Sequence, residues 1–133
     1  MTVPSALRIQ TIQRALGRCE YCHLPDGLGF APHEIDHIVA QKHGGLTTLD
    51  NLALACILCN KHKGSDLTSL DPLNNEIVRL FHPRNDRWSD HFEVRDGFIV
   101  PLTSIGRVTT FLLQLNRPAR IEERKLLISA KGY

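Results

Sequence analysis

Long apolar runs are missing from this chain of 133 residues. A membrane-spanning helix needs about 20 consecutive apolar residues, and no stretch here approaches that length. The first segment, MTVPSALRIQTIQRALGR, is amphipathic and lacks the continuous apolar centre of a secretory signal. We therefore expect this segment to form a helix of the mature protein, and we expect a cytoplasmic protein with no membrane partner.

A strong charge of one sign is also missing, since the formal net charge is only +2. Overall charge therefore does not indicate a protein that binds polyanions. Bases do cluster locally: Arg8, Arg14 and Arg18 have no acid among them, and bases outnumber acids near the C-terminus. Such clusters suit a phosphate backbone, and they are equally typical of an ordinary solvated surface.

The pattern of apolar, glycine and proline residues predicts an α+β fold, with no internal repeat. In the first half we expect a helix over 4–17, a strand over 34–40, a short helix or turn over 49–55, and a short helix ending near Gly64. In the second half we expect a turn-rich segment over 70–76, a hairpin around Asp96-Gly97, and helices over 103–115 and 118–130. The aromatic residues of this half are expected in the core: Trp88, Phe92, Phe98 and Phe111.

Four cysteines form two Cys-x-x-Cys pairs, Cys19/Cys22 and Cys56/Cys59. Two such pairs can supply four thiolates to one tetrahedral Zn²⁺, and a structural zinc contributes roughly 10–16 kcal/mol in zinc-finger peptides. Disulfides would require an oxidising compartment, which nothing in the sequence indicates. A redox function would account for one pair but not for two. The spacing therefore predicts a structural zinc site.

Between the pairs lies Asp36-His37, and the second pair runs directly into Asn60. Hydrolysis of a phosphodiester requires a base, a cation and ligands that hold the cation. Asp36 and Asn60 offer hard oxygen ligands suited to Mg²⁺. His37 offers a base that works in the neutral range. In a regular strand Asp36 and His37 would point to opposite faces, so both reach one ion only if the strand bends or ends there.

Residues 19–66 resemble the HNH nuclease family, whose core is a ββα-metal finger. The matching features occur in the family's order: Cys-x-x-Cys, Asp-His-Ile, Gly-Gly, Asn-Leu and Cys-x-x-Cys-Asn-x-x-Lys. The three letters of the family name correspond to His37, Asn51 and Asn60, with Asn in the third position. Ala40 stands where the family often has proline.

The resemblance implies a role for each matched residue. His37 would be the general base, while Asp36 and Asn60 would bind one catalytic ion, Mg²⁺ or Mn²⁺. Asn51 would orient His37 or its strand, and Lys63 would contact a phosphate of the substrate. Taken singly, each residue also has a plain structural explanation, such as a helix cap for either asparagine.

Together these features predict a single domain over 1–133, with an HNH core over 17–66 and an extension over 67–133 packed on it. The predicted activity is divalent-metal-dependent endonuclease cleavage of DNA, with double-stranded DNA as the expected substrate. One centre cuts one strand, so a homodimer is one way to cut both. The alternative is a non-catalytic, zinc-stabilised module that binds nucleic acid.

Overall fold

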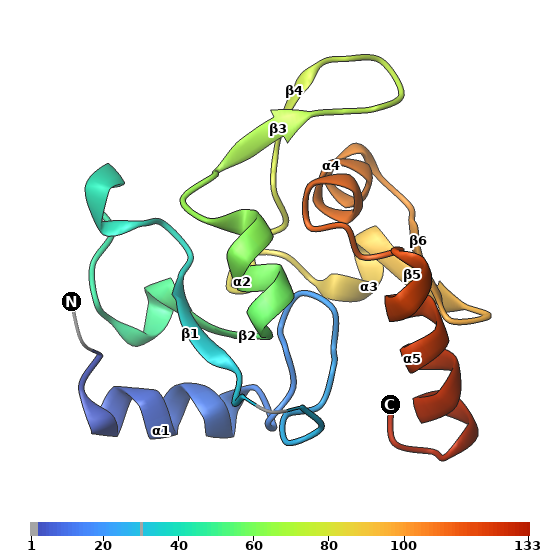
Figure 1. The fold of residues 1–133 in the computed structure, drawn as a ribbon. Helices are drawn as coiled ribbons and strands as arrows, with labels where there is room; N and C mark the ends of the chain where they lie inside the picture. Colours follow the sequence, from blue (N-terminus) through green and yellow to red (C-terminus); the bar gives the residue numbers. More distant parts are fainter. Residues whose placement is uncertain (1–2, 30) are drawn as a thin grey trace. The chain divides into compact units, whose positions relative to one another are not determined.

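The structure, a computed structural model, describes residues 3–29 and 31–133 (Figure 1). The chain divides into two compact units, one ending at Lys61 and the other beginning at His62. Helices and short antiparallel strands alternate along both, which confirms the predicted α+β class. In the described part of the chain, every helix is too short or too polar to cross a membrane.

The first unit contains a β-hairpin followed directly by a helix. Its elements are α1 (Ser5–Arg14), β1 (Glu34–His37), the 3₁₀ turns η1 (Gln41–His43) and η2 (Leu49–Asn51), β2 (Leu52–Ala55) and most of α2 (Ile57–Lys63). Strands β1 and β2 pair antiparallel, with Glu34 opposite Ala55 and His37 opposite Leu52. This β1–β2–α2 order is the ββα arrangement that the sequence predicted.

Two boundaries in this unit differ from the expected ones. The segment expected as a short helix or turn over 49–55 is a 3₁₀ turn only as far as Asn51, and Leu52–Ala55 is a strand. Leucine and alanine favour helices, but pairing with β1 buries all four residues, and burial outweighs local propensity. The strand expected over 34–40 ends at His37, because the Asn51 side chain takes over the backbone hydrogen bonds of Val39.

The second unit contains two hairpins and three helices. They are β3 (Thr68–Leu70), β4 (Ile77–Arg79), α3 (Trp88–His91), β5 (Phe92–Arg95), β6 (Phe98–Pro101), α4 (Ser104–Leu112) and α5 (Pro118–Ser129). The hairpin expected at Asp96-Gly97 is confirmed: both residues have positive φ, 52° and 82°, as a two-residue type I′ turn requires. The turn-rich segment over 70–76 connects β3 to β4, two strands that the sequence did not reveal.

Aromatic packing in the second unit centres on Phe92. Its ring lies 5.4 Å from that of Phe81 and 5.0 Å from that of Trp88, centroid to centroid. Phe98 and Phe111 remain 45% and 65% exposed, so the prediction that they are core residues is wrong. Along β6 the alternation of a strand places Ile99, not its neighbour Phe98, on the buried face.

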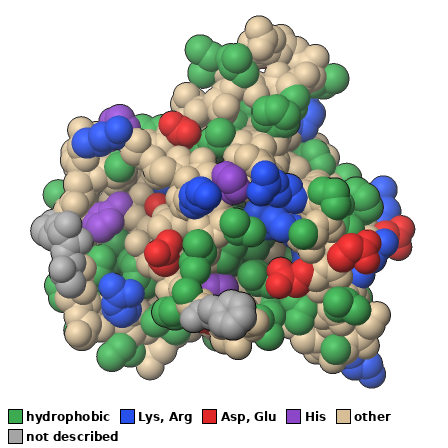
Figure 2. All heavy atoms as spheres, viewed as in Figure 1, with side chains coloured by type: hydrophobic (Ala, Val, Ile, Leu, Met, Phe, Trp, Pro, Cys, Tyr) green, Lys and Arg blue, Asp and Glu red, His purple; other side chains and the backbone are tan. Residues whose placement is uncertain are grey.

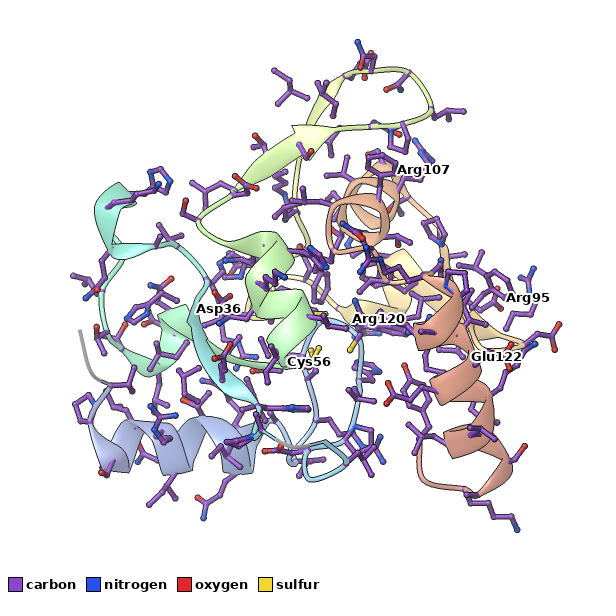
Figure 3. The ribbon with its side chains drawn as sticks, in the orientation of Figure 1. Asp36, Cys56, Arg95, Arg107, Arg120 and Glu122 are labelled. Carbon is purple, nitrogen blue, oxygen red and sulfur yellow. The ribbon has the colours of Figure 1, made fainter. Side chains whose placement is uncertain are left out.

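Several C-terminal bases are used inside the second unit (Figure 3). Arg107 pairs with the buried Asp71 at 2.9 Å and so connects α4 to the β3–β4 turn. Arg120 and Arg124 are buried and donate hydrogen bonds to backbone carbonyls, those of Leu113 and Gly97 among them. These three arginines therefore stabilise the fold of the second unit. The number of C-terminal bases in the sequence overstates the positive charge that a ligand could contact.

Candidate functional site

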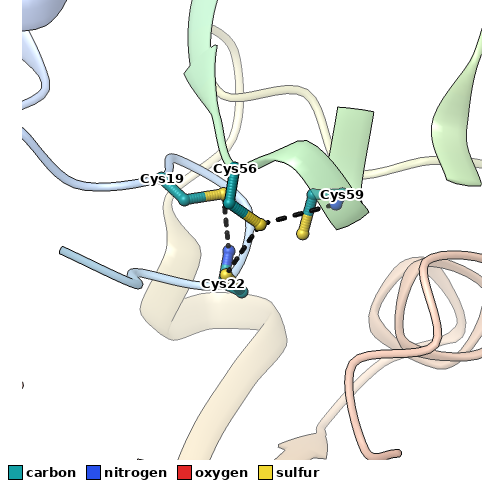
Figure 4. Close-up of side chains that lie close together, drawn as sticks. All are labelled: Cys19, Cys22, Cys56 and Cys59. Atoms are coloured by element: carbon teal, nitrogen blue, oxygen red, sulfur yellow. Dashed lines mark hydrogen bonds between the residues drawn. The ribbon is translucent and has the colours of Figure 1, made fainter. Parts of the chain in front are cut away.

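The four cysteines of the first unit converge at one point (Figure 4). All four Sγ atoms lie within 4.8 Å of one another and all four residues are buried. The Cys22 and Cys56 sulfurs are 3.7 Å apart. Zinc–sulfur bonds of about 2.3 Å in a tetrahedron give a sulfur–sulfur distance of about 3.8 Å. The cluster has the ligand type, number and spacing of a structural zinc site, as predicted.

The local backbone and the burial of these thiols both favour a bound cation. The backbone N–H of Cys22 donates to the Cys19 sulfur at 3.5 Å, and that of Cys59 donates to the Cys56 sulfur at 3.4 Å, so the two knuckles match. Burial raises the pKa of the Cys19 and Cys59 thiols well above the usual value, whereas hydrogen bonds with Cys19 lower the pKa of the Cys22 and Cys56 thiols. Four buried thiolates need a positive charge among them, which a zinc ion would supply.

Asp36 lies beneath the surface of the hairpin and is tied to the first cysteine knuckle. Asp36 is only 5% exposed, and its Oδ2 accepts a hydrogen bond of 2.7 Å from the hydroxyl of Tyr21. Burial and the negative charge of Asp36 raise the pKa of the Tyr21 hydroxyl well above its usual value. The phenol therefore stays protonated and holds the carboxylate in a fixed position.

His37 is half-buried and is held by a residue of the loop that follows β1. Its Nε2 lies 2.9 Å from the Oγ1 of Thr47. When Nε2 carries the proton and donates to this hydroxyl, the other ring nitrogen, Nδ1, has the lone pair that a general base needs. The contact with Thr47 therefore restrains the His37 ring.

Asn51 fixes the shape of this loop. Its Oδ1 accepts from the N–H of Val39, and its Nδ2 donates to the carbonyls of Val39 and Leu46, all at 2.9 Å. Gly45 packs so closely that an added Cβ would lie 1.7 Å from the Val39 carbonyl oxygen. Only glycine fits there. The asparagine thus holds the chain between His37 and Thr47, as a residue that orients the strand would do.

A cleft of about 510 Å³ brings His37 and Asn60 together in the first unit. Its polar lining residues are Arg8, His33, Glu34, His37 and Asn60. Asn60 lies in α2, and its Nδ2 donates a hydrogen bond of 2.9 Å to the Glu34 carboxylate. Three of the four residues of β1, Glu34, Ile35 and His37, line the cleft, whereas the buried Asp36 does not.

Lys63 is the last of the matched residues. It ends α2, belongs to the second unit and is only 2% exposed. Its charge is one of the influences that, after burial, lower the pKa of His82. The predicted contact between Lys63 and a substrate phosphate stays a prediction.

The N-terminal arginines differ in what they do. Arg14 donates to the carbonyl of Leu49 at 2.7 Å and Arg18 to that of His23 at 3.2 Å, so both hold the first unit together. Arg8 is exposed on α1 and lines the cleft. Of the three bases noted in the sequence, Arg8 is the one whose charge faces the candidate site.

A β-hairpin is followed directly by a helix, and a cluster of four thiols lies at the beginning of that helix. This combination defines a ββα-metal type of domain. The family model described as HNH endonuclease matches residues 19–66, the segment that runs from the first cysteine knuckle through α2. Residues 19–66 therefore form an HNH domain, and this family suggests a nuclease type of function with DNA as the kind of substrate. No curated protein matches the chain.

Proposed function

We propose that the chain is a divalent-metal-dependent endonuclease that hydrolyses DNA at the cleft of the first unit. The observation that carries this proposal is that His37 and Asn60, both inside the matched segment, line one cleft. A protein that only bound nucleic acid would have no need for a restrained histidine beside this asparagine.

His37 is the general base. With Nε2 held by Thr47, Nδ1 accepts a proton from a water molecule, and the resulting hydroxide attacks the phosphorus. The bond between phosphorus and the 3′ oxygen breaks, and that oxygen leaves with a proton from solvent. The products are a 5′-phosphate and a 3′-hydroxyl end.

Asp36 and Asn60 are the proposed ligands of the catalytic ion, with Asn60 reaching it from the cleft and Asp36 from the buried side of β1. A carboxylate and an amide oxygen are hard donors, which suits Mg²⁺ or Mn²⁺ rather than a thiophilic metal. Bound there, the ion would stabilise negative charge on the phosphate and on the leaving oxygen. The Tyr21 hydroxyl restrains the Asp36 carboxylate, and Glu34 restrains the Asn60 amide.

The remaining parts of the proposal concern structure and substrate. The four cysteines hold a structural zinc and take no part in the chemistry. Double-stranded DNA is the proposed substrate, and two copies of the chain, each with one centre, would cut both strands. The segment over 67–133 is proposed to pack on the HNH core as one domain with it.

Replacing His37 by alanine tests the proposal. Supercoiled plasmid incubated with Mg²⁺ or Mn²⁺ should be cut by the unaltered chain, and His37→Ala should lower the rate about 10²–10⁴-fold, the usual contribution of a general base. Zinc content and circular dichroism should not change. His43→Ala removes an exposed histidine of the same unit that does not line the cleft, and it serves as the matched control.

Undiminished cleavage by His37→Ala would contradict the proposal. Salt-sensitive DNA binding without cleavage, whichever divalent ion is added, would instead favour the non-catalytic binding module.

A further inference from the structure

We propose that Glu34 is a positioning residue that orients the Asn60 amide toward the catalytic ion. This inference rests on the proposed function and deepens it. Glu34 acts through Asn60, because its carboxylate accepts the hydrogen bond from the Asn60 Nδ2 at 2.9 Å.

The fold brings these two side chains together from elements that adjoin in space. Glu34 is the first residue of β1 and lies opposite Ala55, the last residue of β2. Asn60 lies one helical turn beyond Cys56, and its backbone N–H donates to the Cys56 carbonyl at 2.9 Å. Both side chains belong to residues that line the cleft with His37.

The chemistry of an amide explains why the contact matters. An ionised carboxylate has no hydrogen to donate, so it can face only the NH₂ end of the Asn60 amide. The opposite end, Oδ1, is then directed away from Glu34. A flipped amide would place its oxygen against the carboxylate oxygens, which is repulsive and leaves the NH₂ without this acceptor. Glu34 therefore decides that Asn60 offers oxygen, the atom a hard divalent ion binds.

If the hydrogen bond between Glu34 and Asn60 were purely structural, its only effect would be to hold β1 against α2. Glu34 is exposed, and an exposed hydrogen bond contributes little to stability in water. Orientation of a metal ligand is a different matter, since partners that hold a ligand in place typically change metal affinity about 10–100-fold when removed. The two explanations therefore predict different changes in ion binding.

The test is Mn²⁺ binding to the full, zinc-loaded chain, followed by electron paramagnetic resonance. Glu34→Ala should weaken Mn²⁺ binding about 10–100-fold. Glu34→Gln should bind close to the unaltered chain, because the glutamine oxygen can still accept from the Asn60 Nδ2. Glu123→Ala removes an exposed carboxylate from the second unit and is the matched control for loss of one negative charge. Thermal unfolding and zinc content are measured in parallel.

Three results would overturn the inference: unchanged Mn²⁺ affinity in Glu34→Ala, equal weakening in Glu34→Ala and Glu34→Gln, or no Mn²⁺ binding by the unaltered chain. A lower melting temperature with unchanged Mn²⁺ affinity would assign the contact to stability alone. The first two results leave the proposed function standing, because it depends on cleavage by the unaltered chain and its loss in His37→Ala. Absence of Mn²⁺ binding by the unaltered chain would count against the proposed function as well.

Discussion

At the scale of single residues, three motif residues of the candidate site are each held by a side chain that the motif does not include. In every case one polar atom of the motif residue is committed to the partner, which fixes the direction of the rest of the side chain. The three pairs are Asp36 with Tyr21, His37 with Thr47, and Asn60 with Glu34. Polar groups in such pairs lose orientational freedom before any substrate arrives.

The contact between His37 and Thr47 predicts a kinetic effect. Thr47→Val keeps the branched shape but removes the hydroxyl, so the His37 Nε2 loses this contact and the ring is less well oriented as a base. We expect kcat to fall roughly 10–100-fold, a part of what a general base supplies, with KM nearly unchanged. Steady-state cleavage of a short DNA duplex measures both constants.

Thr48→Val is the control for this change, because the Thr48 hydroxyl bonds to Asp50 and not to His37. An equal loss in both variants, or no loss in Thr47→Val, would show that the contact does not orient the His37 ring as a base.

The sequence identified the motif residues but not their partners. Asp36, His37, Asn51 and Asn60 stand at recognisable spacings, and spacing is visible in a sequence. Thr47 meets His37 only because Gly45 and Asn51 fold the loop back on itself, a contact that spans ten positions. Partners of this kind are determined by tertiary structure, and no local signal marks them.

At the scale of elements, prediction succeeded where turn chemistry or a motif is explicit. Gly64, with φ of 52°, follows α2 as expected, and Asp96-Gly97 forms the turn of the β5–β6 hairpin. Prediction failed at Leu52–Ala55, whose residues favour a helix. It also failed at β3 and β4, which are only three residues long. A strand this short has too few residues to display an alternating pattern, so its pairing cannot be read in advance.

The cysteine cluster connects the turn over 19–22 to the beginning of α2, and its loss should unfold the first unit. Cys19→Ala, or treatment with a strong chelator, should release the metal and remove roughly 10–16 kcal/mol of stabilisation if the site behaves as in zinc-finger peptides. Zinc stoichiometry by mass spectrometry and far-ultraviolet circular dichroism measure the two effects.

Leu28→Ala, at an exposed position after the first knuckle, should change neither zinc content nor helicity. A Cys19→Ala chain that folds and cleaves normally would refute a structural role for zinc.

At the scale of the whole molecule, the available charge is smaller than the composition indicates. Arg14, Arg18, Arg120 and Arg124 all donate hydrogen bonds within their own unit. On the face drawn in Figure 2, Lys and Arg side chains lie in small groups among acids, histidines and apolar groups. Attraction to DNA should therefore come from a few placed charges rather than from a broad positive surface.

Arg8 is the clearest of these placed charges, since it is exposed and lines the cleft. If it contacts one phosphate, Arg8→Ala should weaken DNA binding and reduce the slope of log affinity against log salt by about 0.9. Fluorescence anisotropy of labelled duplex across a salt series, with Ca²⁺ in place of Mg²⁺, measures the slope.

Arg95→Ala removes an arginine that pairs with Glu93 in the second unit and controls for a simple change in net charge. An identical change of slope in both variants would exclude a specific phosphate contact by Arg8.

The tight packing of Gly45 against the Val39 carbonyl has a consequence for how the substrate is met. The Asn51 side chain makes three hydrogen bonds with the backbone of the loop that carries Thr47. The loop therefore has this conformation already in the free protein. The entropy of ordering that loop is lost during folding and not during association. If DNA binds beside this loop, the free energy of its contacts would go into affinity and not into rearranging the loop.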